Sequence, residues 1–179
     1  MNPVFVQVSS YILSYVFVTA ALHKWRDRAR FEGILQNYRV LPRFAVRPAA
    51  VLLPPLEFGL GVALLPFVGG GLAAWPAAAL LILYSAAIAL NLLRGRRSID
   101  CGCGGTEHGQ TLSEWLLLRN AILIVFATLA AVPMSARSLA WYEWIIVLFA
   151  SGAGCLFYHT GNLLLVNRDL LRNLRLNNG

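Results

Sequence analysis

The chain has 179 residues, of which 58% are hydrophobic and only 13% are charged, and its formal net charge is +7. Soluble domains carry about 25% charged residues, so this composition excludes an ordinary soluble fold. The excess of cations does not indicate a nucleic-acid-binding protein, because the Lys and Arg residues gather in the connections between hydrophobic segments. The partner that this pattern predicts is a lipid bilayer.

Five hydrophobic segments approach or exceed the ~20 apolar residues that cross the hydrocarbon core of a bilayer. They are Val4–Leu22, Pro48–Val68, Leu72–Leu93, Trp115–Val132 and Trp144–Val166. Three of them lack Asp, Glu, Lys and Arg, while the second contains only Glu57 and the fourth only Arg119. We therefore predict an all-α integral membrane protein, a single domain over residues 1–179 that is a bundle of about five transmembrane helices.

The Lys and Arg residues mark one side of this five-span arrangement. Thirteen of the fifteen lie in residues 23–47, 94–114 and 167–179, which are alternate connections. Because cytoplasmic connections retain Lys and Arg, we predict a periplasmic N-terminus and a cytoplasmic C-terminus. Residues 1–10 contain no basic residue and no small-residue cleavage site follows Leu22, so the first span is expected to be retained rather than removed as a signal peptide.

The segment after the first span combines apolar and charged side chains at helical spacing. Phe31, Leu35, Tyr38 and Leu41 follow one another at intervals of four, three and three, with charged residues between them. The pattern predicts an amphipathic helix over residues 28–41 that lies on the membrane surface. A solvated loop is the alternative.

The second span carries the clearest ionisable residue at membrane depth, Glu57. Pro54 and Pro55 precede it and predict a kink, and Gly59 and Gly61 follow it and permit close helix packing. A carboxylate at this depth should be protonated or paired. Its candidate partners are His23, Lys24, Arg119 and His159. Two roles stay open for Glu57: proton handling or substrate contact, and a structural tie between helices.

A close cysteine pair lies between the third and fourth spans. Cys101 and Cys103 are separated by one glycine in a glycine-rich run. An oxidised pair at this spacing closes a small, strained ring, and strained disulfides are labile and oxidising. The pattern therefore favours Cys101 and Cys103 as a catalytic redox pair for thiol–disulfide exchange. Metal binding with His108 as a third ligand is one alternative, and a tight loop without thiol chemistry is another.

Two further residues are candidates for this chemistry. Arg119 could favour the thiolate if it folds close to the pair, because nearby cations stabilise a thiolate. Cys155 lies within the fifth span, where it is either a small packing residue or a third thiol that receives the disulfide. His159 lies four residues later, so it shares a helix face with Cys155.

Two local patterns predict helix geometry near these residues. Thr111-Leu-Ser-Glu114 matches a capping box, so the fourth spanning helix is expected to begin near Leu112. The small residues Ser151-Gly-Ala-Gly-Cys155 predict a close contact between the fifth spanning helix and a neighbour.

Several motifs occur together in an order that resembles one family. They are Lys24 after the first span, Tyr38-Arg-Val-Leu-Pro42, Leu53-Pro-Pro-Leu-Glu57, Asn91-Leu-Leu-Arg-Gly95, Cys101-Gly-Cys-Gly104 and Leu118-Arg-Asn120. Over roughly residues 10 to 130 the chain resembles the methylamine utilisation protein MauE family, which is itself similar to DoxX-like membrane proteins. The resemblance implies a protein of the bacterial inner membrane with a DoxX-like four-helix core plus one further helix.

The resemblance also implies a function in methylamine metabolism. Family members are expected to assist the maturation of the small (beta) subunit of periplasmic methylamine dehydrogenase, which carries many disulfides, together with a thioredoxin-like partner. A non-enzymatic scaffold for assembly or transport, and a quinone-linked subunit built around Glu57, are the alternatives. No cofactor is expected, and the sequence gives no support for a bound quinone. Gly104 stands where many relatives have a bulky residue, which loosens the loop.

The predicted orientation and the implied role disagree about the side of the membrane that the thiols serve. The charge pattern places Cys101 and Cys103 on the cytoplasmic side, whereas the implied substrate matures in the periplasm. An exception to the charge rule, a re-entrant loop reached from outside, or transfer of reducing equivalents across the bilayer would reconcile the two.

Overall fold

A computed structural model describes residues 3–68, 71–96, 99, 112–132 and 139–177 of the chain. The described residues form helices and no strand, which confirms the predicted all-α fold. The helices are α1 (Pro3–Arg26), α2 (Arg28–Tyr38), α3 (Arg43–Ala63), α4 (Gly71–Leu93), α5 (Glu114–Ala131) and α6 (Trp141–Asn177). All except α2 are long and apolar enough to cross a membrane, so the chain is a multi-pass membrane protein with the predicted five spans.

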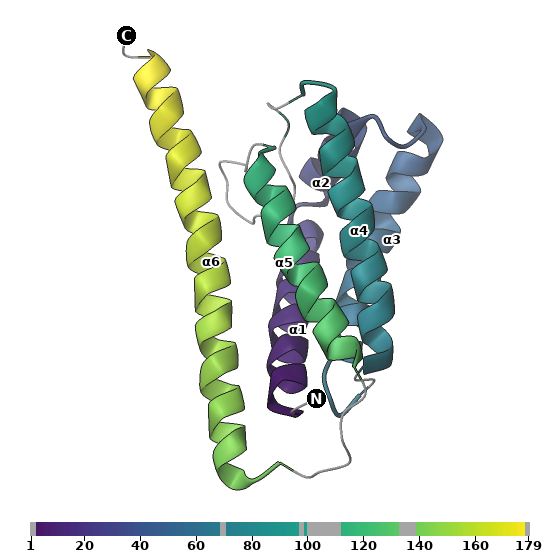
Figure 1. Cartoon of the computed structure of the whole chain (residues 1–179). Coiled ribbons are helices and arrows are strands. Elements are labelled where there is room, and N and C mark those ends of the chain that lie inside the picture. The colour runs from purple at the N-terminus through teal and green to yellow at the C-terminus, as the bar shows by residue number, and fades with distance from the viewer. Residues whose placement is uncertain (1–2, 69–70, 97–98, 100–111, 133–138, 178–179) are drawn as a thin grey trace.

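The first five helices pack together, and α6 runs along one side of them (Figure 1). Helix α1 contacts α3, α5 and α6, while α4 packs on α5 and α2 packs on α3. This arrangement agrees with the predicted four-helix core plus one further helix. The side of the membrane that each end of the bundle faces stays a prediction.

One end of the bundle is closed by a small core of its own. Its buried residues come from α2, from the last part of α4, from the start of α5 and from the residue two positions before α5: Ile34, Tyr38, Ile88, Leu116 and Leu112. We call this the α2 end. The described parts of the basic segments 23–47 and 94–114 therefore meet at the same end of the molecule, as the alternating charge pattern requires.

Helix α2 is the predicted amphipathic helix, with a different buried face. Phe31, Ile34 and Tyr38 are buried, at intervals of three and four, whereas Leu41 is exposed beyond the end of the helix. The helix stops because Arg39 adopts the left-handed conformation, with φ of 47°. Leu41 therefore cannot share the helical face that the sequence spacing assigns to it. Whether α2 also touches the membrane surface stays a prediction.

Several helix ends differ from the predicted boundaries. Helix α3 ends at Ala63 rather than Val68, because Pro66 disfavours helical backbone in the residue before it. Helix α6 continues to Asn177, well past Val166, since the loss of hydrophobicity ends a membrane span without ending a helix.

The start of α5 also lies later than the capping box predicts. The helix begins at Glu114 with Ser113 as its N-cap, two residues after the predicted start at Leu112. Leu112 is instead buried in the core of the α2 end, and its backbone N–H donates to the carbonyl oxygen of Ile99. Thr111, the predicted cap, lies outside the described residues.

One of the two predicted packing glycines makes a close contact between helices. A Cβ atom added at Gly61 of α3 would lie 2.8 Å from Cγ2 of Val18 and 3.1 Å from the backbone nitrogen of Val18, on α1. A Cβ atom at Gly59 would meet nothing within 4 Å. The small-residue run on α6 behaves similarly, since Gly154 packs against Ile12 of α1. Glycine thus sets the distance between α1 and both of these neighbours.

We predict that Gly61→Ala lowers the free energy of unfolding by about 1–3 kcal/mol, because the added methyl group forces α1 and α3 apart. Gly59→Ala is the matched control, and it should be neutral or stabilising by up to about 1 kcal/mol, since alanine favours helix over glycine. Denaturant unfolding in detergent, followed by circular dichroism, compares the two. Equal stabilities would contradict the assigned contact.

Candidate functional site

The predicted intramembrane carboxylate is one partner of a buried ion pair. Glu57 of α3 is 1% exposed, and its Oε1 accepts a hydrogen bond from Nζ of Lys24, which lies on α1 and is 3% exposed. The hydroxyl of Tyr84 on α4 donates to the same oxygen. Lys24 is therefore the ion-pair partner among the four candidates, and the interaction joins three spanning helices.

Aromatic rings surround the ammonium group of Lys24. Its Nζ lies 5.0 Å from the ring centroid of Phe31 and 4.8 Å from that of Tyr84. A cation over a ring face is attracted by the ring quadrupole, more strongly where water is excluded. Because Phe31 belongs to α2, this helix covers the ion pair on one side. One carboxylate and two aromatic rings therefore compensate the charge on Lys24.

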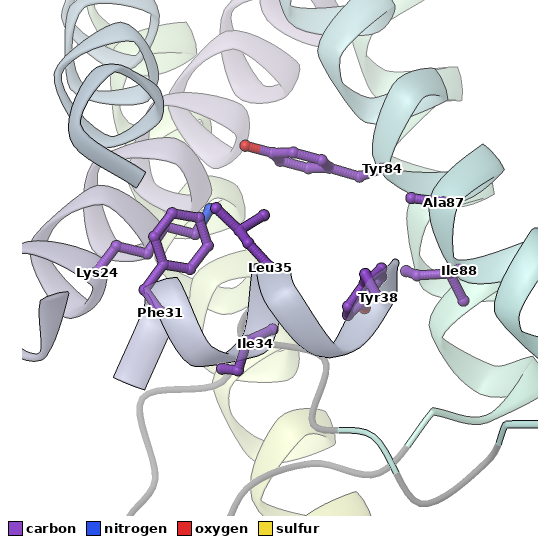
Figure 2. A pocket seen from close by; sticks show the side chains of 8 residues that line it. All are labelled: Lys24, Phe31, Ile34, Leu35, Tyr38, Tyr84, Ala87 and Ile88. Atoms are coloured by element: carbon purple, nitrogen blue, oxygen red, sulfur yellow. The ribbon is translucent and has the colours of Figure 1, made fainter. Parts of the chain in front are cut away.

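A cavity of about 70 Å³ lies between the ion pair and α2 (Figure 2). Its lining residues are Lys24, Phe31, Ile34, Leu35, Tyr38, Tyr84, Ala87 and Ile88. Figure 2 shows Lys24 and Phe31 on one side of the cavity and Tyr38 with Ile88 on the other. Tyr38 and Ile88 also belong to the core of the α2 end, so this cavity extends from the ion pair to that core.

A second, smaller cavity of about 30 Å³ lies beside the same ion pair. Its polar lining residues are Lys24, Glu57, Tyr84, Arg119, Asn120 and Tyr158. Two predicted site residues, Glu57 and Arg119, are thereby brought to one cavity. Glu57 Oε2 is buried and has no hydrogen-bond partner among the described residues. The volume is sufficient for a water molecule, which would need polar partners of this kind.

Arg119 connects α5 to α6. Its Nη1 donates to Oδ1 of Asn162 at 3.0 Å and its Nη2 donates to Oδ1 of Asn120 at 3.5 Å. The guanidinium carbon lies 5.7 Å from the ring centroid of Tyr158. These contacts give Arg119 a place in the interior of the bundle. Its predicted role as a thiolate partner stays a prediction.

The cysteine pair lies outside the described residues. Cys101, Cys103 and His108 all fall in 100–111, so the redox pair and the alternative metal site stay predictions. The two residues that border this segment are described, and the backbone N–H of Leu112 donates to the carbonyl oxygen of Ile99 at 3.0 Å. The segment therefore leaves and rejoins the described structure at one place, which is the α2 end.

Cys155 lies on α6 and is a half-buried free thiol. His159, on the same helix, is exposed. Across the residues that the structure describes, no cluster of three His, Cys, Asp or Glu side chains could hold a metal ion. The third-thiol role of Cys155 stays a prediction.

Tyr84 is absent from the residues that we predict from sequence, although a signal for it exists. Its position in the middle of a charge-free span is unusual, because tyrosines of membrane proteins gather at the interfaces. A buried tyrosine hydroxyl needs a hydrogen-bond partner, and Glu57 was the nearest unexplained polar group at this depth. The sequence alone does not show that α3 and α4 bring the two together.

The family model described as methylamine utilisation protein MauE matches residues 2–134. The chain belongs to the MauE family. It is 40% identical to the methylamine utilization protein MauE of Paracoccus denitrificans, over 85% of this chain and 82% of the relative. It is 34% identical to that of Methylophilus methylotrophus, over 91% and 87%, and 36% identical to that of Methylorubrum extorquens, over 93% and 90%. No solved structure matches.

The buried ion pair lies within the part of the chain that the MauE family model matches. Lys24, Glu57, Tyr84 and Arg119 fall inside residues 2–134, together with the cysteine pair. The residues that α6 contributes to the site lie outside residues 2–134. The alignments with the three MauE relatives cover a larger share of the chain than the family model does. The predicted resemblance to the MauE family is thereby confirmed.

We predict that Lys24→Met and Glu57→Gln each lower the free energy of unfolding by about 3–5 kcal/mol, because each leaves an uncompensated buried charge. The double variant should lose much less than the sum of the two, since it removes both charges. Unfolding in detergent gives the coupling energy of the pair. Additive losses would mean that the two side chains do not depend on each other.

Proposed function

We propose that this MauE-family protein acts in methylamine utilisation as a membrane thiol–disulfide component that assists the maturation of periplasmic methylamine dehydrogenase. Its relatives in Paracoccus denitrificans and Methylophilus methylotrophus are named as methylamine utilization proteins. The observation that carries the proposal is the pair Cys101 and Cys103, in a segment whose borders at Ile99 and Leu112 are hydrogen-bonded to each other.

The proposed chemistry is an exchange between the loop pair and a dithiol of a thioredoxin-like partner. A partner thiolate attacks one sulfur of the Cys101–Cys103 disulfide and forms a mixed disulfide, which the second partner thiol then resolves. The partner leaves oxidised and the loop pair leaves as two thiols, so two electrons and two protons are transferred. The same intermediate serves the reverse reaction, in which the loop pair reduces its partner.

The described surroundings of the segment support this chemistry. The thiolate is the attacking form, and cations stabilise it. Arg94 and Arg96 follow the last turn of α4, directly before the segment. The buried ion pair of Lys24 and Glu57 ties the helices beneath α2, so the segment is anchored to a well-packed end of the bundle. In this proposal Glu57 is a structural tie rather than the reacting group.

We predict that the double variant Cys101→Ser, Cys103→Ser reduces maturation of the dehydrogenase small subunit to background, because it removes both reacting sulfurs. Cys155→Ser is the matched control, and it should retain function because its thiol is not part of the pair. The measurement is the disulfide content of the small subunit in cells that depend on each variant. Full maturation with the double variant would favour a non-enzymatic assembly scaffold.

A trapping experiment identifies the partner class. In a Cys155→Ser background, a single Cys101→Ser change removes the loop disulfide and leaves Cys103 as a lone thiol. Cys103 can then attack the disulfide of an oxidised partner, and the mixed disulfide of the reverse reaction should accumulate because Cys101 is not there to resolve it. Recovery of a thioredoxin-fold protein in that adduct supports exchange, and its absence under oxidising conditions counts against it. Labelling of Cys103 by a membrane-impermeant reagent in intact cells would support access from outside. Protection until the membrane is opened would support a cytoplasmic or buried pair.

A further inference from the structure

A large apolar cleft separates α5 from α6. Its volume is about 630 Å³, and it arises because α6 packs on α1 while leaving the outer face of α5 uncovered. Leu118 and Ile122 of α5 form one wall, and Phe157 and Leu164 of α6 form the other. All four side chains are substantially exposed within the described structure.

One end of the cleft carries a group of polar side chains. Arg119 donates to Oδ1 of Asn162 at 3.0 Å, and both residues line the cleft together with Tyr158. Because the Asn162 oxygen accepts from Arg119, the amide nitrogen is the donating end that this side chain presents to others. A guanidinium group and an amide N–H₂ form a set of donors suited to a phosphate or carboxylate.

The cleft covers about half of the membrane thickness. From Trp115 to Phe126 on α5 it extends about 16 Å at a rise of 1.5 Å per residue. The hydrocarbon core of a bilayer is about 30 Å thick. Arg119 lies five residues after the start of α5, which is about 8 Å from that helix end. The donors therefore lie towards the interface at the α2 end, and the apolar part extends towards the bilayer centre.

We propose that this cleft binds one anionic phospholipid from the leaflet at the α2 end. The phosphate contacts Arg119 and Asn162, and one acyl chain lies along Ile122 towards Phe126 and Gly154. The α2 end also carries most of the described cations of the chain, and such clusters attract anionic lipids. The bound lipid would fill the space that α6 leaves beside α5 and would hold these two helices in their present arrangement.

The dimensions favour a lipid over another transmembrane helix. A helix that crosses the bilayer would need a groove along both leaflets, whereas this cleft spans about one.

Native mass spectrometry of the full chain tests the proposal. Protein purified in detergent is incubated with equal amounts of phosphatidylglycerol and phosphatidylcholine vesicle lipids. The wild-type chain should retain phosphatidylglycerol preferentially, and Arg119→Gln should lower that retention roughly tenfold or more, because a charge-assisted contact is lost. Arg94→Gln, which removes an exposed cation at the same end but outside the cleft, should retain the lipid.

A second pair of variants covers the case in which Arg119→Gln fails to fold. Gly161 lines the cleft, and an added Cβ atom there meets nothing within 4 Å, so Gly161→Leu starts from open space and extends a side chain into the lipid site. Gly152 on the same helix is equally unobstructed and does not line the cleft, so Gly152→Leu is the control. Loss of phosphatidylglycerol only in Gly161→Leu supports the site. Unchanged retention in both, or equal retention of the two lipids by the wild type, overturns it. In a chain whose three native cysteines are replaced by serine, a disulfide-linked dimer formed through Leu118→Cys would assign the cleft to a second copy and overturn the proposal.

Discussion

The Lys24–Glu57 ion pair is the interaction on which the arrangement of the bundle depends. A lone charge at membrane depth is costly, so each of these residues requires the other. Their contact forces α1 and α3 into one register, and the Tyr84 hydroxyl adds α4 to the same oxygen. Helix α2 then has a defined place, because Phe31 lies over the ammonium group. The glycine contact between Gly61 and Val18 allows the two helices to approach closely enough for the pair to form.

The ion pair also lies close to the end of the bundle at which the segment with the cysteine pair begins and ends. One cavity extends from the ion pair to the core of the α2 end, where Leu112 and Ile99 border that segment. Another extends to Arg119, which bonds to α6 and lines the apolar cleft. In the proposed function, the cysteine pair meets its partner at one end of the bundle while the packed spans hold the helices together. This division of roles is the one that we propose for a membrane component of disulfide exchange.

The five spans can be predicted from sequence because crossing a bilayer requires long apolar segments. Lys24 can be predicted as a candidate partner of Glu57 because an isolated charge at membrane depth requires pairing. Contacts between helices do not, since they depend on which faces meet. Tyr84 therefore escapes prediction, and Ile34 rather than Leu41 completes the buried face of α2 because the chain turns at Arg39. Helix α3 ends at Ala63 because of Pro66. A boundary predicted from hydropathy misses this local signal, since the residues around Pro66 are themselves hydrophobic. The cysteine pair is visible only as a motif, and its chemistry rests on spacing.

The most direct test of the central claim is a redox titration of Cys101 and Cys103 in isolated membranes, in a Cys155→Ser background. Thiol-reactive mass tags would count the free thiols across a series of glutathione buffers. We expect one two-electron transition of the pair. Its reduction potential should lie well above about −300 mV, the value below which structural disulfides typically fall. A pair that stays reduced in every buffer, or that stays oxidised in the most reducing one, would contradict thiol–disulfide exchange as the function of this segment.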